Sequence, residues 1–176
     1  MFVDTIYYPL VRALRDRPDE TALSVKGEAY DNRRLAMLMA PVMKELDTFS
    51  DSAVALLMEE EAVTKAALFA CMLCGKTVVP VWLSWNEEQQ KRVVECSGAR
   101  KFLTRARMFY YYWMTYEDAV CRIDDGLPVS RDLPYAARLY LFDGDGNMHD
   151  RYLTAEEWLR SLRHQGFIKP DELKCI

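Results

Sequence analysis

The sequence has no run of more than two consecutive basic residues and no uncharged apolar stretch of membrane-spanning length. Acidic residues outnumber lysine and arginine by 27 to 23, so the formal net charge is -4. Proteins that bind nucleic acid need a basic excess to neutralise phosphates. We therefore expect neither a nucleic-acid partner nor insertion into a membrane.

A secretory signal and a hydrolytic motif are also missing. Asp4 interrupts the apolar N-terminal segment, and the cysteines number five, an odd count in a chain with enough apolar residues for a core. Reduced thiols and a cytoplasmic location are the expectation. Only two histidines are present, and no serine or cysteine stands in a known nucleophile motif, so no catalytic residue is assigned.

What the sequence does contain is an alternation of apolar strands and helices. Residues 53–58, 77–83 and 99–104 are short apolar runs, separated by helical segments at 59–75 and 84–98. Strands without polar alternation, joined through helices, are typical of an α/β fold: a mainly parallel sheet with helices on both faces. The second helix is expected to open with a capping box from Ser84 to Glu87.

The segments before and after this core are also readable. A helix over 3–15, a hairpin turning at Lys26-Gly27 and a helix capped by Asp31 or Asn32 precede it. Residues 106–135 give only a weak pattern. A strand at 136–142, a loop rich in Asp and Gly, and a helix capped by Thr154 and Glu157 follow. We interpret residues 1–176 as a single domain.

Three phrases in this chain resemble the N-terminal part of the adenylate-forming enzymes, which include acyl-CoA synthetases, luciferases and peptide-synthetase adenylation domains. DRPDETALSVKGEAYDNRRLAMLMAPVMKEL is similar to the family's opening stretch. AALFACMLCGKTVVPVWL resembles its next motif at Gly75, Val79 and Pro80, and ECSGARKFLT the phrase that follows it. The phrases come in the family's order, and GFIKPDEL is similar to the turn after its signature helix. The resemblance implies the N-terminal subdomain of that fold, without the second sheet subdomain and the C-terminal lid.

The resemblance places LYLFDGDGNMHDRYLT where the family has its phosphate-binding signature. In the family, backbone amides, hydroxyls and a lysine grip the phosphates of ATP. Here the Ser/Thr run and the Pro-Lys-Gly are lost, and Asp143, Asp145 and Asp150 stand near where the phosphates would lie. The degenerate cofactor-binding position implied by the resemblance comprises Asp143, Gly144, Asp145, Gly146, Asn147 and Thr154.

The same loop has a second interpretation, as a cation site. Asp143, Asp145 and Asn147 place side-chain oxygens at alternate positions, like the first half of a calcium loop. Met148 and Thr154 stand where such a loop needs glycine and glutamate. Calcium or magnesium at these three residues and a solvated turn are both left open by the sequence.

Other features allow two interpretations each. Glu59–Glu61 follow a strand at the edge where α/β folds place ligands, or they face the dipole of the next helix. Cys71 and Cys74 form a CxxC that favours core packing over redox or zinc chemistry. The run Tyr110–Trp113 is either sheet cover or a partner surface.

The resemblance and the missing motifs together predict a degenerate, AMP-dependent synthetase-like domain. Alone it is expected to be non-catalytic, to need no cofactor, and to act by binding a second copy, another polypeptide or a carrier protein over an uncovered sheet face. The alternative is part of an active AMP-forming ligase, completed by further sequence or another chain, in which case ATP and magnesium are the cofactors.

Overall fold

The computed structural model describes residues 2–104, 115–125 and 135–169. Its helices are α1 Phe2–Asp16, α2 Asn32–Leu46, α3 Ala62–Leu73, α4 Glu87–Ser97, α6 Tyr116–Asp125 and α7 Ala155–His164. Its strands are β1 Thr21–Val25, β2 Glu28–Asp31, β3 Ala53–Met58, β4 Thr77–Trp82, β5 Phe102–Leu103, β6 Ala137–Phe142 and β7 Met148–Leu153. The run Tyr110–Trp113 lies outside the described residues.

The main sheet has five strands in the order β5-β3-β4-β6-β7. Strands β5, β3, β4 and β6 run parallel, and β7 pairs antiparallel with β6 at the edge. The predicted mainly parallel sheet is therefore confirmed. Strand β7 was not expected, because its residues alternate poorly and four of the six are exposed.

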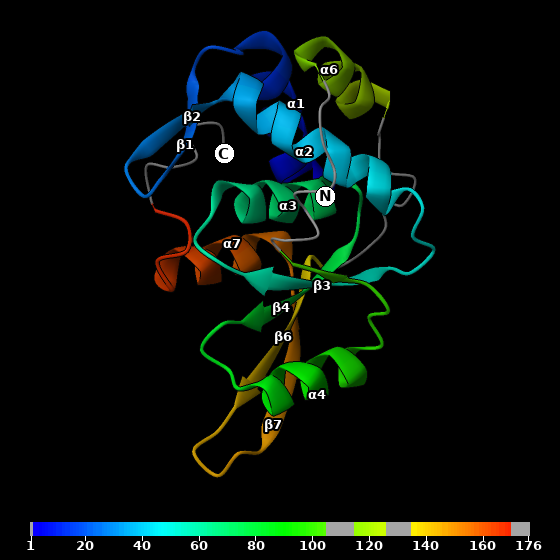
Figure 1. The fold of residues 1–176 in the computed structure, drawn as a ribbon, viewed down its shortest axis with the longest axis vertical. Helices are drawn as coiled ribbons and strands as arrows, with labels where there is room; N and C mark the ends of the chain where they lie inside the picture. The colour runs from blue at the N-terminus through cyan, green and yellow to red at the C-terminus, as the bar shows by residue number, and fades with distance from the viewer. Residues whose placement is uncertain (1, 105–114, 126–134, 170–176) are drawn as a thin grey trace.

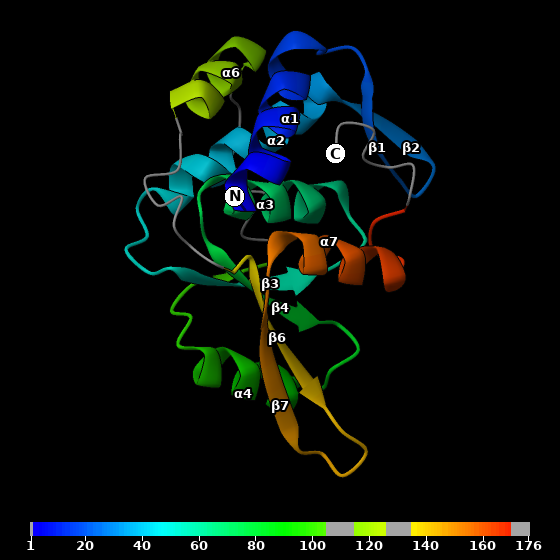
Figure 2. The same ribbon diagram turned by 180° about the vertical axis from the view of Figure 1, so that it is seen from behind.

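Helices cover both faces of this sheet, as the sequence predicts. Figure 1 shows α3 and α7 on one face and α4 on the other, while α1, α2 and α6 lie beyond α3 as a further layer. Seen from behind in Figure 2, the β6–β7 hairpin projects past the rest of the sheet. The larger core cluster fills the α3 and α7 side, where Trp158 of α7 is fully buried.

The smaller core cluster lies between the sheet and α4. Val93 is the buried residue of α4, and it packs with Ala55, Val79, Val81 and Tyr140. A single buried anchor is little apolar area for an 11-residue helix. The attachment of α4 therefore depends strongly on Val93.

The N-terminal elements form where the sequence places them. Strands β1 and β2 make the predicted hairpin, with Lys26 and Gly27 at φ 52° and 83°, the left-handed angles that a two-residue turn requires. The side chain of Asp31 accepts a hydrogen bond from the backbone N–H of Arg34 and caps α2. Helix α1 ends at Asp16, before the Arg17-Pro18 pair.

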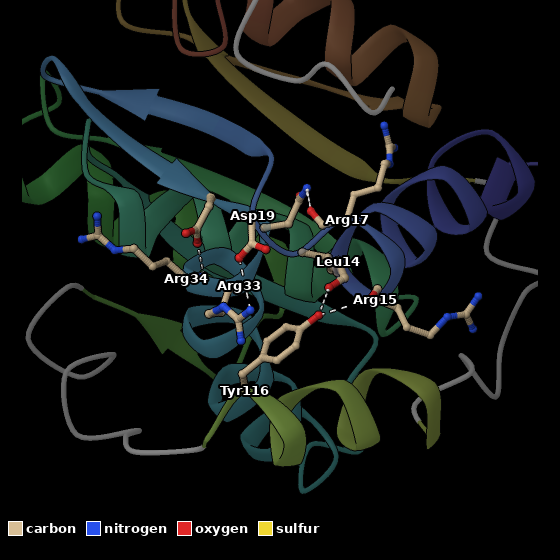
Figure 3. Close-up of polar contacts among 9 residues, drawn as sticks. Leu14, Arg15, Arg17, Asp19, Arg33, Arg34 and Tyr116 are labelled. Atoms are coloured by element: carbon tan, nitrogen blue, oxygen red, sulfur yellow. Dashed lines mark hydrogen bonds and ion pairs between the residues drawn. The ribbon is translucent and has the colours of Figure 1, made fainter.

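Polar contacts join α1, α2 and α6 (Figure 3). The hydroxyl of Tyr116 donates to the carbonyl of Leu14 at 2.8 Å and lies 3.2 Å from that of Arg15, so it satisfies carbonyls at the C-terminal end of α1. The guanidinium of Arg33 lies over the Tyr116 ring, 4.4 Å from its centroid, and bonds to Asp19. These contacts fix α6 against the N-terminal helices.

Candidate functional site

A cavity of about 450 Å³ lies at the carboxyl edge of the parallel strands. Segments that follow β3 and β4, the end of β6 and the residues after α7 surround it. Its lining residues are Glu60, Trp82, Ser84, Trp85, Leu141, Phe142, Gln165, Gly166 and Phe167. This is the edge at which open α/β sheets bind ligands.

Pro80 explains why the sheet opens at this edge. The N–H of Val78 donates to the carbonyl of Ala136, next to the single registered pair between β4 and β6, Val78 with Ala137. The next β4 amide that would point toward β6 is two residues on, at position 80, and proline has no N–H. Pairing stops there, so the ends of β4 and β6 are free to separate around the cavity.

The wall formed by the β4–α4 connection is held by hydrogen bonds. The side chain of Gln90 donates to the carbonyl of Trp85 at 2.9 Å, and the Trp85 ring meets Phe142 edge to face at 5.4 Å. The capping box that starts α4 is formed by Asn86 and Gln89. The predicted box from Ser84 to Glu87 is wrong, because Ser84 lies before the cap and lines the cavity.

The Asp/Gly loop is a tight turn between two antiparallel strands. The N–H of Asp143 donates to the carbonyl of Asn147, the N–H of Gly146 donates to the carbonyl of Asp143, and Gly146 takes a left-handed φ of 79°. The expected passage from loop directly to helix is wrong, because the six residues of β7 separate the turn from α7.

The carboxylate of Asp143 sits at the centre of this turn. Its Oδ1 accepts from the backbone N–H groups of Asp145 and Asn147, at 2.9 and 2.8 Å. Its Oδ2 accepts from the side-chain amide of Asn147 at 3.2 Å and lies 3.0 Å from Nε2 of His149. The hydrogen bond with His149, followed by those with the turn, lowers the pKa of Asp143 to about 2.

The remaining predicted site residues lie in different environments. Thr154 is the N-cap of α7, and its hydroxyl bonds within the capping box to Glu157, which confirms the predicted cap. Asp150 bonds to the guanidinium of Arg138 across the β6–β7 ladder, at 2.5 and 2.7 Å. The structure therefore brings Asp143, Asp145 and Asn147 together and places Thr154 and Asp150 elsewhere.

For a metal, the turn offers few open oxygens. Within residues 2–104, 115–125 and 135–169, no group of three or more His, Cys, Asp or Glu side chains is arranged to hold an ion. Both carboxylate oxygens of Asp143 already accept hydrogen bonds. The cation interpretation of Asp143, Asp145 and Asn147 stays a prediction.

The aromatic side chains of the cavity were missed by sequence reasoning. Trp82 and Trp85 come from one loop and Phe167 from the segment after α7, so nothing in their spacing marks them as neighbours. One signal was present: Glu60 belongs to the acidic run that follows β3 at the carboxyl edge. That run precedes α3, which has no acidic residue in its first turn.

The CxxC pair packs in the core, as predicted. Cys71 is fully buried and Cys74 is partly buried at the end of α3. Burial raises the pKa of both thiols, that of Cys74 to about 11, so they are protonated at neutral pH. No helix among the described residues is both long and apolar enough to cross a membrane.

Comparisons with known proteins rest on the fold. No family model matches the sequence, and no curated protein matches it. Solved structures of adenylation enzymes do match. The nonribosomal peptide synthetase FmoA3, bound to alpha-methyl-L-serine-AMP, superposes with a TM-score of 0.65 at 16% identity, over 91% of this chain and 19% of its own.

Two further structures give the same result. The adenylation domain AlmE of Vibrio cholerae, bound to glycyl-adenosine-5'-phosphate, has a TM-score of 0.67 at 13% identity, over 91% of this chain and 37% of its own. The N-terminal subdomain of Klebsiella oxytoca NpsA has a TM-score of 0.60 at 18% identity, over 84% and 40%. This chain spans less than half the length of these three proteins, and its fold is that of part of an adenylation domain.

Proposed function

We propose that this chain is a degenerate adenylation-type domain that is non-catalytic alone and acts in the cytoplasm by binding another polypeptide. The observation that carries the proposal is the occupancy of the turn at 143–147. Its backbone N–H groups at Asp145, Gly146 and Asn147 all donate within the turn, two of them to the carboxylate of Asp143. A phosphate-binding loop keeps such amides available for the ligand.

The charge of the turn supports the same conclusion. Two like charges at contact distance repel by about 1 kcal/mol in water and by about 4 kcal/mol at an intermediate protein dielectric. Asp143 holds its negative charge where a phosphate would need donors, and Asp145 adds a second acid. ATP binding by this turn is therefore strongly disfavoured unless a metal bridges the acids.

Exposed apolar side chains support the polypeptide-binding part of the proposal. Leu83 and Leu141 are 57% and 48% exposed, and Leu141 lines the cavity, which follows the strand preceding Leu83. Tyr135 and Tyr152 are also exposed, and their rings stack at 4.9 Å beside β6 and β7. Large apolar side chains grouped on a surface are typical of protein interfaces. A second copy and a carrier protein are the two partners we consider.

Calorimetry with ATP, with and without magnesium, tests the catalytic side of the proposal on the purified chain. We expect no binding at millimolar ATP. Light scattering on the same sample tests for a second copy: a dimer that dissociates in the Leu83→Ser, Leu141→Ser variant supports this surface as the interface. Submillimolar ATP affinity that depends on magnesium contradicts the proposal.

The second candidate is part of an AMP-forming ligase that activates a carboxylic or amino acid. It is favoured by the length comparison, because the adenylation enzymes named above contain much more chain than the part matched here. Further sequence or a second polypeptide would then supply the missing contacts to ATP and magnesium. Pyrophosphate release from ATP by the completed assembly, absent when this chain is omitted, would establish it.

A further inference from the structure

We propose that the cavity at the carboxyl edge binds a small amphipathic amine, with an aromatic or alkyl body between its rings and an ammonium group beside Glu60. This inference is independent of the proposed polypeptide partner, and it concerns the cavity rather than the turn at 143–147. Its volume of about 450 Å³ is within the usual range for small-molecule sites.

The rings of the cavity determine the body of the ligand. Two indoles, Trp82 and Trp85, and two phenyl rings, Phe142 and Phe167, line the space together with Leu141. Such walls favour an apolar or aromatic group, and indole is the ring that attracts cations most strongly. The Trp85–Phe142 contact and the burial of Phe167 hold these rings in place without a ligand.

The charge of the lining determines the polar end of the ligand. Glu60 is the charged residue among the described lining residues, and the other polar side chains are Ser84 and Gln165. Glu60 is exposed, so its carboxylate lies near the mouth and not deep among the rings. An ammonium group at the mouth is attracted to this carboxylate, whereas a carboxylate ligand is repelled.

Two basic side chains lie near the rings but do not line the cavity. The guanidinium of Arg92 is 6.0 Å from the Phe142 centroid, and Nζ of Lys65 is 5.5 Å from that of Phe167. Arg92 is exposed and therefore screened by solvent. Both cations are near the phenyl rings, so the indoles and Glu60 are the groups assigned to the ammonium.

Three probes of matched shape and different charge test the proposal: phenethylamine, phenethyl alcohol and hydrocinnamate. Each is titrated into the full chain while the indole N–H signals of Trp82 and Trp85 are followed by NMR. The fully buried Trp158 serves as an internal control that should not shift. An exposed carboxylate and an exposed cation–ring contact together predict about three- to tenfold tighter binding of the amine than of the alcohol.

Two substitutions separate the role of Glu60 from general electrostatics. Glu60→Gln should weaken phenethylamine about two- to fivefold and leave the alcohol unchanged. Glu88→Gln removes the same charge from an exposed position on α4 outside the cavity and should leave both probes unchanged. Equal binding of hydrocinnamate and amine, or no effect of Glu60→Gln, overturns the assignment of an amine. No shift of either indole with any probe overturns the site itself.

Discussion

Replacing Thr154 by alanine should lower the free energy of unfolding by about 1 kcal/mol. The hydroxyl accepts from the backbone N–H of Glu157 at 3.3 Å and lies 3.1 Å from its Oε2, which in turn accepts from the N–H of Thr154 at 2.9 Å. Alanine removes the hydroxyl, and the Glu157 N–H at the start of α7 loses its acceptor. The loss corresponds to about 2–4 °C in melting temperature for a domain of this size.

Urea unfolding followed by circular dichroism measures this effect, with Thr154→Ser as the matched control. Serine keeps the hydroxyl and should stay within a few tenths of a kcal/mol of the parent, with an unchanged slope against urea. The backbone N–H of Thr154, followed by its hydroxyl, lowers the pKa of Glu157. Because the folded pKa is below the ordinary value of 4.5, the contribution of Glu157 is present above that pH and is lost below it.

This experiment also separates two roles of Thr154. The resemblance assigns its hydroxyl to a phosphate-binding motif, whereas the structure uses it as a helix cap. If Thr154→Ala unfolds at the same urea concentration as Thr154→Ser, the hydroxyl does not stabilise the helix and the capping argument is refuted.

Three further predictions follow from the same structure. Asp143→Ala should speed hydrogen exchange at the amides of Asp145 and Asn147, measured by NMR, and acid should act likewise: the pKa of Asp143 is lowered from its ordinary 3.8 to about 2, so its contribution is present above 3.8 and is lost as the pH falls through 2. Val93→Ala should cost about 2 kcal/mol in urea unfolding, since it removes the buried anchor of α4; a cost below 0.5 kcal/mol contradicts that role. Tyr140→Phe should be neutral or stabilising by up to about 1 kcal/mol, because the buried hydroxyl has no hydrogen-bond partner among the described residues; a clear loss contradicts it.

The sequence predicted those elements whose signals are local. Apolar runs of six residues in β3 and β4, and the Asp31 and Thr154 caps, are visible within a few neighbouring positions. Strand β7 was missed because it is an edge strand: His149, Asp150 and Arg151 face solvent and carry charged or polar groups, so no period of apolar residues marks it. Its pairing with β6 depends on the turn between them.

The capping error at α4 has a similar physical origin. Ser84 and Glu87 satisfy the spacing of a capping box, but so do Asn86 and Gln89, and the helix starts at the second pair. Starting there leaves the residues from Leu83 to Trp85 outside the helix, where Ser84 and Trp85 form a wall of the cavity. Which of two adequate caps is used is decided by packing against Phe142, which lies 56 residues beyond Asn86 and gives no local signal.

The turn at 143–147 links the fold to the loss of nucleotide chemistry. A loop that binds phosphate through its amides leaves those donors to water when the ligand is absent, and this is tolerable only while the site is solvated or used. A single carboxylate within the turn supplies permanent acceptors for the amides of Asp145 and Asn147 and stabilises the hairpin. The same carboxylate competes with any incoming phosphate for those donors and repels it. Replacement of Asp143 therefore exposes the amides but also weakens the hairpin that presents them, so restoring a phosphate site would need a second change that stabilises β6 and β7.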